Sequence, residues 1–391
     1  MESLVKRGIK VEVLTGKPNY PEGVISPGYC IWDCQREHWN GAILHRVPLI
    51  PRGRNSRFGL LVNYLSFIFS GLIFGPWLLR GRSYDVIFVY GVSPILQAIP
   101  ALFLGWLKGG KVIIWIQDLW PESLSATGHV LNRHIIGAVR QVVRFIYCYA
   151  DLLLVQSRAF EKPVRALASG TPIIYYPNSV DDTFAVSVIG QTPHVHGLGD
   201  GFSVMFAGNI GTAQAVGVMV EAASLLKEYA DIHLVILGDG SCREEMLRMV
   251  QQRGLTNLHL PGRFPLETMP SFMRKASALL VTLADQPIFA ATVPSKVQAY
   301  MAAGRPIIAC LNGEGARLVV EAEAGLATSA ENPRALADTI LHLYRLSPSE
   351  RKKMGDNGRR YYQDHFGHDL LIDQLLGHLQ AVSQSGKGIL K

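Results

Sequence analysis

The 391-residue chain contains little charge and little cysteine. Charged residues make up 18% of it and hydrophobic residues 48%, a balance that excludes an intrinsically disordered chain. Its five cysteines include one close pair, Cys30 and Cys34, and neither a second pair nor a histidine cluster completes a metal site. We therefore expect free thiols in a reducing cytoplasm, with no bound metal and no cofactor.

Targeting and nucleic-acid-binding signals are also lacking. The segment Met1–Gly8 has the pattern of a helix end that leads into a strand, and not that of a signal peptide. The net charge of +7 fits attraction to anionic lipid headgroups, nucleotides or nucleic acid. Because no run of Lys and Arg is interleaved with aromatic residues, we expect no nucleic acid partner.

One stretch of 21 residues, Gly59–Leu79, contains no charged residue and is long enough to span a bilayer. Glycines, polar residues and Pro76 dilute its hydrophobicity. Three interpretations stay open: a buried core helix, a helix lying in the membrane interface, and a transmembrane span. Five arginines flank the stretch and favour contact with an anionic membrane surface: Arg52, Arg54, Arg57, Arg80 and Arg82.

Short apolar runs recur along the chain, and each ends in a small or polar residue. Nine runs predict strands: Val86–Tyr90, Val112–Ile116, Leu152–Val155, Ile173–Tyr176, Val204–Ala207, Leu234–Leu237, Asn257–Leu260, Ala278–Leu283 and Ile307–Cys310. Helical patterns separate most of them, as in His134–Tyr149, Val216–Tyr229, Arg243–Arg253 and Pro333–Leu346. This alternation predicts an α/β fold of two doubly wound, Rossmann-like parallel-sheet domains, with ligands at the carboxyl ends of the strands.

A glycine-rich segment without either periodicity lies between Asp182 and Gly201 and predicts the domain boundary. We expect a first domain over residues 1–184, a linker over 185–201, a second domain over 202–365 and a C-terminal helix over 366–391.

The segment Pro294–Gly315 predicts a helix that starts at a ligand site and leads into a buried strand. Ser295 suits the N-cap, and Gln298 completes a capping-box pattern. Gly304 suits the helix end. Lys296 adds a positive charge to the free N–H groups of the first turn, which an anionic ligand requires. The alternative is an ordinary αβ unit with a surface lysine.

The segment Phe206–Ala215 places Gly208, Asn209, Gly211 and Gln214 between a strand and a helix. Glycines there allow close approach of the backbone to a diphosphate, and the amides can bond ring hydroxyls or phosphate oxygens. A tight βα turn without a ligand explains the pattern equally well.

Together these features resemble retaining glycosyltransferases of the GT-B fold, family 4, and in particular the N-acetyl-L-fucosamine transferase type of bacterial O-antigen and capsule assembly. The resemblance rests on four segments: Lys10–Gly23, Trp115–Ser123, Phe206–Gln214 and Pro294–Gly315. It implies that the second domain binds a nucleotide-diphosphate sugar and the first domain the acceptor. It also implies that a final helix, about Leu370–Val382, crosses back to the first domain.

The chain departs from the family pattern at the donor site. Ala291 and Ala299 replace two glutamates, and Asn209 and Gln214 replace a commonly found Arg and Lys. Positive charge then has to come from Lys296 and Arg263. The complete predicted donor-binding set is Gly208, Asn209, Gly211, Gln214, Arg263, Ser295, Lys296, Gly313, Glu314 and Gly315, with Glu314 for a donor hydroxyl.

In the first domain Gln117 stands where the family often has a histidine, followed by Asp118 and by Glu122 one turn later. These two carboxylates can orient or deprotonate the acceptor hydroxyl. Alternatively, Asp118 caps the next turn and Glu122 is solvated. Family members also begin with a strand and a glycine-rich loop ahead of the helix that ends near Arg7. This chain starts inside that helix, so either its start is misassigned or the first strand is missing.

The resemblance implies metal-free transfer of a sugar, with retention, to a lipid-linked saccharide, with Asp118, Glu122 and Lys296 as catalytic residues. We expect a cytoplasmic protein that is peripheral on the inner face of the cell membrane. Two alternatives stay open: a nucleotide-sugar epimerase of the same fold, and a truncated, non-catalytic homologue that acts as a binding subunit.

Overall fold

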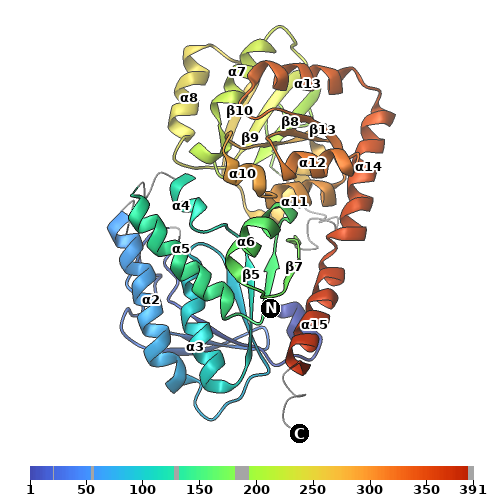
Figure 1. Cartoon of the computed structure of the whole chain (residues 1–391). Coiled ribbons are helices and arrows are strands. Elements are labelled where there is room, and N and C mark those ends of the chain that lie inside the picture. The colour runs from blue at the N-terminus through green and yellow to red at the C-terminus, as the bar shows by residue number, and fades with distance from the viewer. Residues whose placement is uncertain (21, 54–56, 127–131, 181–192, 386–391) are drawn as a thin grey trace. The chain divides into compact units, whose positions relative to one another are not determined.

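The computed structural model describes residues 1–20, 22–53, 57–126, 132–180 and 193–385. The chain divides into two compact units (Figure 1). Unit 1 comprises Met1–Tyr176 with Ile372–Lys391, and unit 2 comprises Pro177–Leu371. Much of the predicted linker, residues 185–192, lies outside the described residues.

Unit 1 contains two sheets in its described part. The first has the order β1-β3-β2, with β1 (Glu12–Thr15) parallel and β2 (Gln35–Trp39) antiparallel to β3 (Ala42–Arg46). The second is fully parallel in the order β4-β5-β6-β7: Val86–Gly91, Lys111–Ile116, Leu152–Val155 and Ile173–Tyr175. The four residues of β6 are all buried Val or Leu, as expected for a central parallel strand.

The helices of unit 1 connect and cover these strands. They are α1 (Glu2–Lys6), α2 (Arg57–Leu78), η1 (Ile95–Gln97), α3 (Ala98–Lys108), α4 (Glu122–Ala126), α5 (Arg133–Cys148), η2 (Arg158–Phe160) and α6 (Glu161–Ala168). The Asn132 side chain caps α5 by accepting a hydrogen bond from the His134 amide. The last helix, α15 (His368–Gln384), begins in unit 2 and belongs to unit 1 from Ile372 onward.

Unit 2 contains one six-stranded parallel sheet in the order β10-β9-β8-β11-β12-β13. Its strands are β8 (Phe202–Ala207), β9 (Ile232–Leu237), β10 (Leu258–Gly262), β11 (Ala278–Thr282), β12 (Ile307–Cys310) and β13 (Gly325–Thr328). Its helices are η4 (Thr212–Gln214), α7 (Gly217–Leu225), α8 (Arg243–Gln252), η5 (Leu266–Thr268), α9 (Met269–Lys275), α10 (Pro287–Ala291), α11 (Ser295–Ala303), α12 (Glu314–Glu321), α13 (Pro333–Arg345) and α14 (Pro348–His365).

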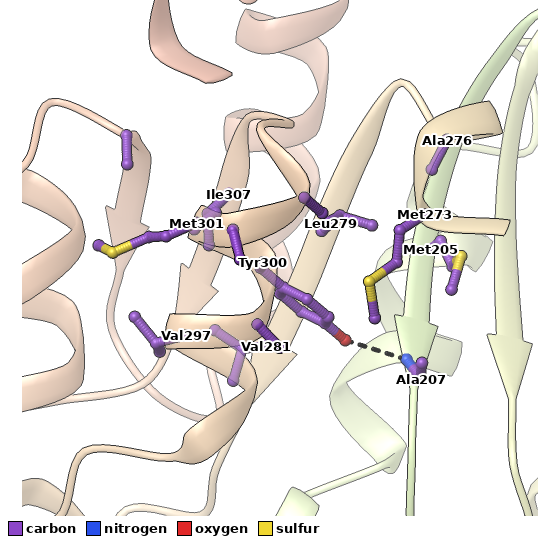
Figure 2. Packing of buried hydrophobic residues seen from close by; sticks show 14 of the residues in the cluster. Met205, Ala207, Met273, Ala276, Leu279, Val281, Val297, Tyr300, Met301 and Ile307 are labelled. Carbon is purple, nitrogen blue, oxygen red and sulfur yellow. Dashed lines mark hydrogen bonds between the residues drawn. The ribbon is translucent and has the colours of Figure 1, made fainter. Parts of the chain in front are cut away.

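Both faces of this sheet are buried. Val204 and Phe206 point into a cluster with α7, α8 and α13, whereas Met205 and Ala207 point into a cluster with α9, α11, α12 and α14. In the second cluster the Tyr300 hydroxyl of α11 accepts a hydrogen bond of 3.1 Å from the Ala207 amide (Figure 2). This bond holds α11 against the end of β8.

The predicted α/β fold is confirmed, and all nine predicted strands are present within two residues at each end. The strand that was expected to follow the helix end at Met1–Gly8 is present as β1. The sequence did not predict β2, β3 or β13, and the antiparallel β2–β3 pair in unit 1 is an addition to the expected parallel arrangement. β2 and β13 carry exposed and half-buried residues, and so they lack the continuous apolar runs that identify central strands. β3 is mainly buried, but His45 and Arg46 interrupt its apolar run.

Candidate functional site

Two glycine turns interlock at the carboxyl ends of β8 and β9. The Gly208 amide donates to the Leu237 carbonyl, and the Ile210 amide donates to the Asp239 carbonyl, each over 2.8 Å. A Cβ atom on Gly238 would lie 1.8 Å from the Gly208 carbonyl oxygen. The turns therefore approach each other as closely as only glycine permits, and they place backbone groups at the predicted ligand edge.

Lys296 reaches from the first turn of α11 to the end of β8. Its Nζ lies 3.8 Å from the centroid of the Phe206 ring. A Cβ on Gly208, where φ is +135°, would lie 2.6 Å from the Cε of Lys296 and 2.8 Å from its Nζ, so glycine makes room for this side chain. Burial lowers the pKa of Lys296 to about 7. Among the described residues, no carboxylate forms an ion pair with this buried cation.

The start of α11 differs from the predicted capping box, which is wrong. Pro294 is the N-cap, Ser295 is the exposed first helical residue, and no side chain caps the helix. Gln298 is fully buried, and within the described chain its side-chain atoms have no hydrogen-bond partner. No side-chain cap uses the first-turn amides; the Val297 amide donates to the Pro294 carbonyl over 2.9 Å, which leaves the amides of Ser295 and Lys296 for an anion. The predicted helix end at Gly304, with φ of +67°, is confirmed.

The N-terminus of α12 lies beside that of α11. Gly313 is its N-cap at φ +78°, and a Cβ on Gly315 would lie 3.1 Å from the Cδ of Pro294. Glu314 forms a two-fold ion pair with Arg317, with N–O distances of 3.0 and 3.1 Å. Two helix N-termini with Lys296 beside them therefore make a positive edge. The role of Glu314 as a ligand of a donor hydroxyl stays a prediction.

The predicted amide ligands bond to each other. Asn209 Nδ2 donates to Gln214 Oε1 over 3.3 Å, and the Gly211 amide donates to the same oxygen over 3.2 Å. Gln214 therefore stabilises its own turn, as the simpler interpretation of this segment expects. Arg263 follows the last residue of β10 and is exposed.

Sequence reasoning missed two carboxylates at this edge, Asp285 and Glu331. Asn312 donates to Asp285 over 2.8 Å and accepts from the Ala330 amide over 3.1 Å. The Asp285 amide in turn donates to Glu331 over 3.2 Å. Asp285 follows the end of β11, and polar residues at strand ends are the signal that identified the other candidates.

In unit 1, Asp118 follows the end of β5 and is partly buried. Burial raises the pKa of Asp118, and hydrogen bonds from Ser93 oppose the shift. Ser93 Oγ also accepts a bond of 2.7 Å from the Trp120 indole. A carboxylate with a raised pKa is a better proton acceptor near neutral pH.

Glu122 begins α4, and its side chain is 43% exposed. The Arg140 guanidinium of α5 lies 3.5 Å from its carboxylate. Asp118 and Glu122 thus lie in unit 1, whereas the predicted donor residues lie in unit 2.

Throughout the described residues, no group of His, Cys, Asp and Glu is arranged to hold a metal ion. Three histidines do meet at the opposite, amino-terminal side of the unit 2 sheet. His259 Nε2 lies 3.3 Å from His233 Nδ1, and the His196 ring lies 4.7 Å from that of His259. Burial, together with the two neighbouring rings, lowers the pKa of His259 to about 4, so the His259 ring is neutral at pH 7.

Two family models match the chain. The model of the glycosyl transferase 4-like domain matches residues 1–178, and that of glycosyl transferases group 1 matches residues 201–345. Together they account for most of both units.

Curated relatives carry related names. WcaI of Escherichia coli, named as a colanic acid biosynthesis glycosyl transferase, is 25% identical over 318 residues that cover 78% of this chain and 76% of the relative. WbjE of Pseudomonas aeruginosa, named as a glycosyltransferase, is 25% identical over 346 residues, 86% of this chain and 84% of the relative.

Solved structures share the fold. Trehalose 6-phosphate synthase from Burkholderia multivorans matches with a TM-score of 0.73 at 11% identity, over 98% of this chain and 99% of that one. Sucrose-phosphate synthase from Thermosynechococcus elongatus matches with a TM-score of 0.71 at 20% identity, over 97% and 91%. HepE from Anabaena, in complex with UDP, matches with a TM-score of 0.66 at 11% identity, over 95% and 100%.

The family models and the named relatives favour a transferase over both the epimerase and the non-catalytic homologue. The chain belongs to the glycosyltransferases of the GT-B type, with a 4-like domain in its N-terminal part and a group 1 domain in its C-terminal part.

Proposed function

We propose that this glycosyltransferase moves a sugar from a nucleotide-diphosphate sugar to a lipid-linked saccharide in the synthesis of a bacterial surface polysaccharide, with retention of configuration. The names of WcaI and of an O-antigen chain mannosyltransferase from Escherichia coli, 25% identical over 189 residues that cover 45% of each chain, support this class of acceptor. Within it we favour the N-acetyl-L-fucosamine transferase type, on the resemblance described above.

The observation that carries the proposal is the partly buried Lys296, whose side chain forms no ion pair with any carboxylate among the described residues. It lies at the carboxyl edge of the sheet, next to the uncapped start of α11 and to Gly208. A leaving nucleoside diphosphate gains negative charge as the glycosidic bond breaks, and a positioned ammonium group with backbone N–H groups stabilises that charge. UDP in the similar HepE structure supports a nucleotide donor for this edge.

Asp118 is the proposed proton acceptor for the acceptor hydroxyl, with Glu122 orienting the saccharide. The raised pKa of Asp118 supports this role, because the carboxylate is held in a desolvated position at a strand end. No metal is required in this proposal, since Lys296, the exposed Arg263 and the starts of α11 and α12 supply the positive charge. The protein would act in the cytoplasm, at the inner face of the cell membrane.

The test is Lys296→Ala, expressed in a strain of the source bacterium from which the gene has been deleted. We expect at least about a 100-fold loss of transfer, the usual effect of removing one group that stabilises charge in the transition state. Mass spectrometry of lipid-linked saccharides should show the same shortened intermediate as in the deletion strain.

The exposed Lys227 supplies the matched control, Lys227→Ala, which should restore the full-length product. Thermal unfolding of both purified variants should match that of the original chain. A normal lipid-linked product from Lys296→Ala would contradict the proposal.

A further inference from the structure

The outward face of α2 is entirely apolar. Six positions between residues 58 and 78 are exposed, at 39% to 75% of the side chain: Phe58, Leu61, Leu65, Phe69, Ile73 and Trp77. They follow a spacing of three or four residues, so they form one stripe along the helix. A helix that packs with one face on a water-soluble domain normally presents charged and polar side chains on its other face. The outward face of α2 therefore has the composition of a helix that meets an apolar medium.

The inward face of α2 packs against the rest of unit 1 and forms hydrogen bonds with it. Asn63 donates to the Ile50 carbonyl over 2.6 Å, and Ser66 Oγ accepts from the Ile50 amide over 3.1 Å. Farther along, a Cβ on Gly71 would lie 2.9 Å from Pro100 of α3. By length and composition alone α2 qualifies as a membrane span. Spanning, however, would require these polar and close-packed contacts to break.

Along the sequence, the charge that flanks α2 has one sign, and two of the arginines, Arg46 and Arg82, form ion pairs with Glu37 and Glu12 from farther away in the chain. Residues 38–84 contain no Asp or Glu, and they contain six arginines: Arg46, Arg52, Arg54, Arg57, Arg80 and Arg82. The Arg80 guanidinium lies 5.5 Å from the Trp77 ring, at the end of the stripe. An apolar face bordered by arginine and tryptophan matches the boundary between acyl chains and anionic headgroups, where each basic residue adds about 1 kcal/mol of attraction.

A second copy of the chain fits this face less well. Two-fold pairing of parallel or antiparallel α2 helices would bring the arginines that flank one helix against those that flank the other. Like charges meeting at the edge of an apolar contact oppose it. An anionic bilayer offers acyl chains to the apolar stripe and negative headgroups to the arginines that flank it.

We propose that α2 lies flat in the headgroup region of an anionic membrane leaflet, with its apolar stripe in the acyl boundary, and so docks unit 1 on the membrane without crossing it. The biological role of this docking rests on the proposed function, because docking of α2 on the membrane brings a lipid-linked acceptor to unit 1. Tyr64 on α2 is placed near Asp118: burial raises the pKa of Tyr64, Arg52 lowers it, and the Asp118 charge raises it further. This interaction links α2 to the part of unit 1 that holds the proposed proton acceptor.

The experiment is co-sedimentation of the full chain with vesicles of phosphatidylcholine alone, or of phosphatidylcholine and phosphatidylglycerol in equal parts. The test variant carries Phe69→Glu and Ile73→Glu, at positions that are 60% and 65% exposed. The matched control carries Leu225→Glu and Leu266→Glu in unit 2, 49% and 66% exposed. We expect the original chain and the control to bind the anionic vesicles, and the test variant to bind at least about tenfold more weakly.

Equal vesicle binding by the original chain and the test variant would overturn the inference. It would also be overturned if the original chain bound no vesicles but formed dimers that the test variant separated in light scattering, since α2 would then be a protein interface. The vesicles contain neither donor nor acceptor, so sedimentation does not depend on the proposed function. A chain that binds them but adds no sugar to lipid-linked saccharide would refute the proposed function alone.

Discussion

Lys296 is the residue on which the candidate donor site depends. Its ammonium group rests against the Phe206 ring, and burial brings its pKa to about 7, so a large share of molecules carry a neutral amine there at pH 7. A bound diphosphate favours the charged form and raises the pKa. Donor binding is therefore coupled to proton uptake at this side chain.

The sign of this coupling gives a prediction. Above pH 7 the free enzyme must take up a proton when it binds UDP, so the affinity for UDP should fall by up to about tenfold per pH unit, until the pKa of the complex is reached. Calorimetric titration with UDP in buffers of different ionisation enthalpy measures both the affinity and the proton uptake.

Lys296→Arg is the control, because a guanidinium stays charged throughout this pH range. Its affinity for UDP should be independent of pH between 7 and 9. A flat profile in the original chain would show that Lys296 is charged before the ligand arrives.

At the scale of residues the sequence indicated Lys296, because a positive charge beside the free N–H groups of a first helical turn favours an anionic ligand. It did not indicate that Gln298 is buried, or that Asp285 and Glu331 join Asn312 at the same edge. Those positions depend on how the loops after β11 and β13 fold over each other, and no local pattern encodes that.

At the scale of elements, a buried hydrogen bond links α11 to β8, in addition to their hydrophobic packing. The β8–β11 ladder ends at the Met205–Leu279 pair, and two residues farther on the Tyr300 hydroxyl accepts from the Ala207 amide (Figure 2). Ala207 precedes Gly208, where Lys296 lies. The bond therefore holds together α11, which carries Lys296, and β8, which carries the Phe206 ring.

Tyr300→Phe should lower the free energy of unfolding by about 1–3 kcal/mol, because it leaves a buried amide without its acceptor. Urea denaturation followed by far-UV circular dichroism measures the loss. Tyr229→Phe, at a tyrosine that is 37% exposed, is the control and should change stability by less than about 0.5 kcal/mol. An unchanged urea midpoint for Tyr300→Phe would mean that water replaces the hydroxyl.

The strands with continuous apolar runs could be predicted from the sequence. For α2 the sequence predicted a helix, but it did not predict which face of the helix is buried. Its composition is apolar all round, so neither charge nor period distinguishes the face on α3 from the exposed face. Only the packing at Gly71, Asn63 and Ser66 shows which side is inside.

At the scale of the whole molecule, much of the excess positive charge comes from one region. Between residues 38 and 117 the chain has one acidic residue, Asp85, against eight Lys and Arg residues. This distribution of charge did not help to predict the fold, because the placement of surface charge does not determine chain topology. It does indicate which binding partners the surface attracts.

Vesicle binding should accordingly depend on salt. Between about 0.1 M and 1 M salt the Debye length falls from about 10 Å to 3 Å, and affinity for the anionic vesicles should drop at least about tenfold without vanishing, because the apolar stripe remains. Sedimentation over a salt series measures this. If salt did not change the affinity for anionic vesicles, the arginines would not contribute to binding, and the apolar stripe alone would account for it.

The bare ammonium of Lys296 has a consequence for work at the bench. Among the residues that the structure describes, no acidic side chain neutralises it, so an incoming oxyanion has no internal competitor to displace. In the proposed site, sulfate or inorganic phosphate should compete with the donor diphosphate, and assays in such buffers should understate turnover. Amine or zwitterionic buffers with chloride as the counterion are the better choice for measuring this enzyme.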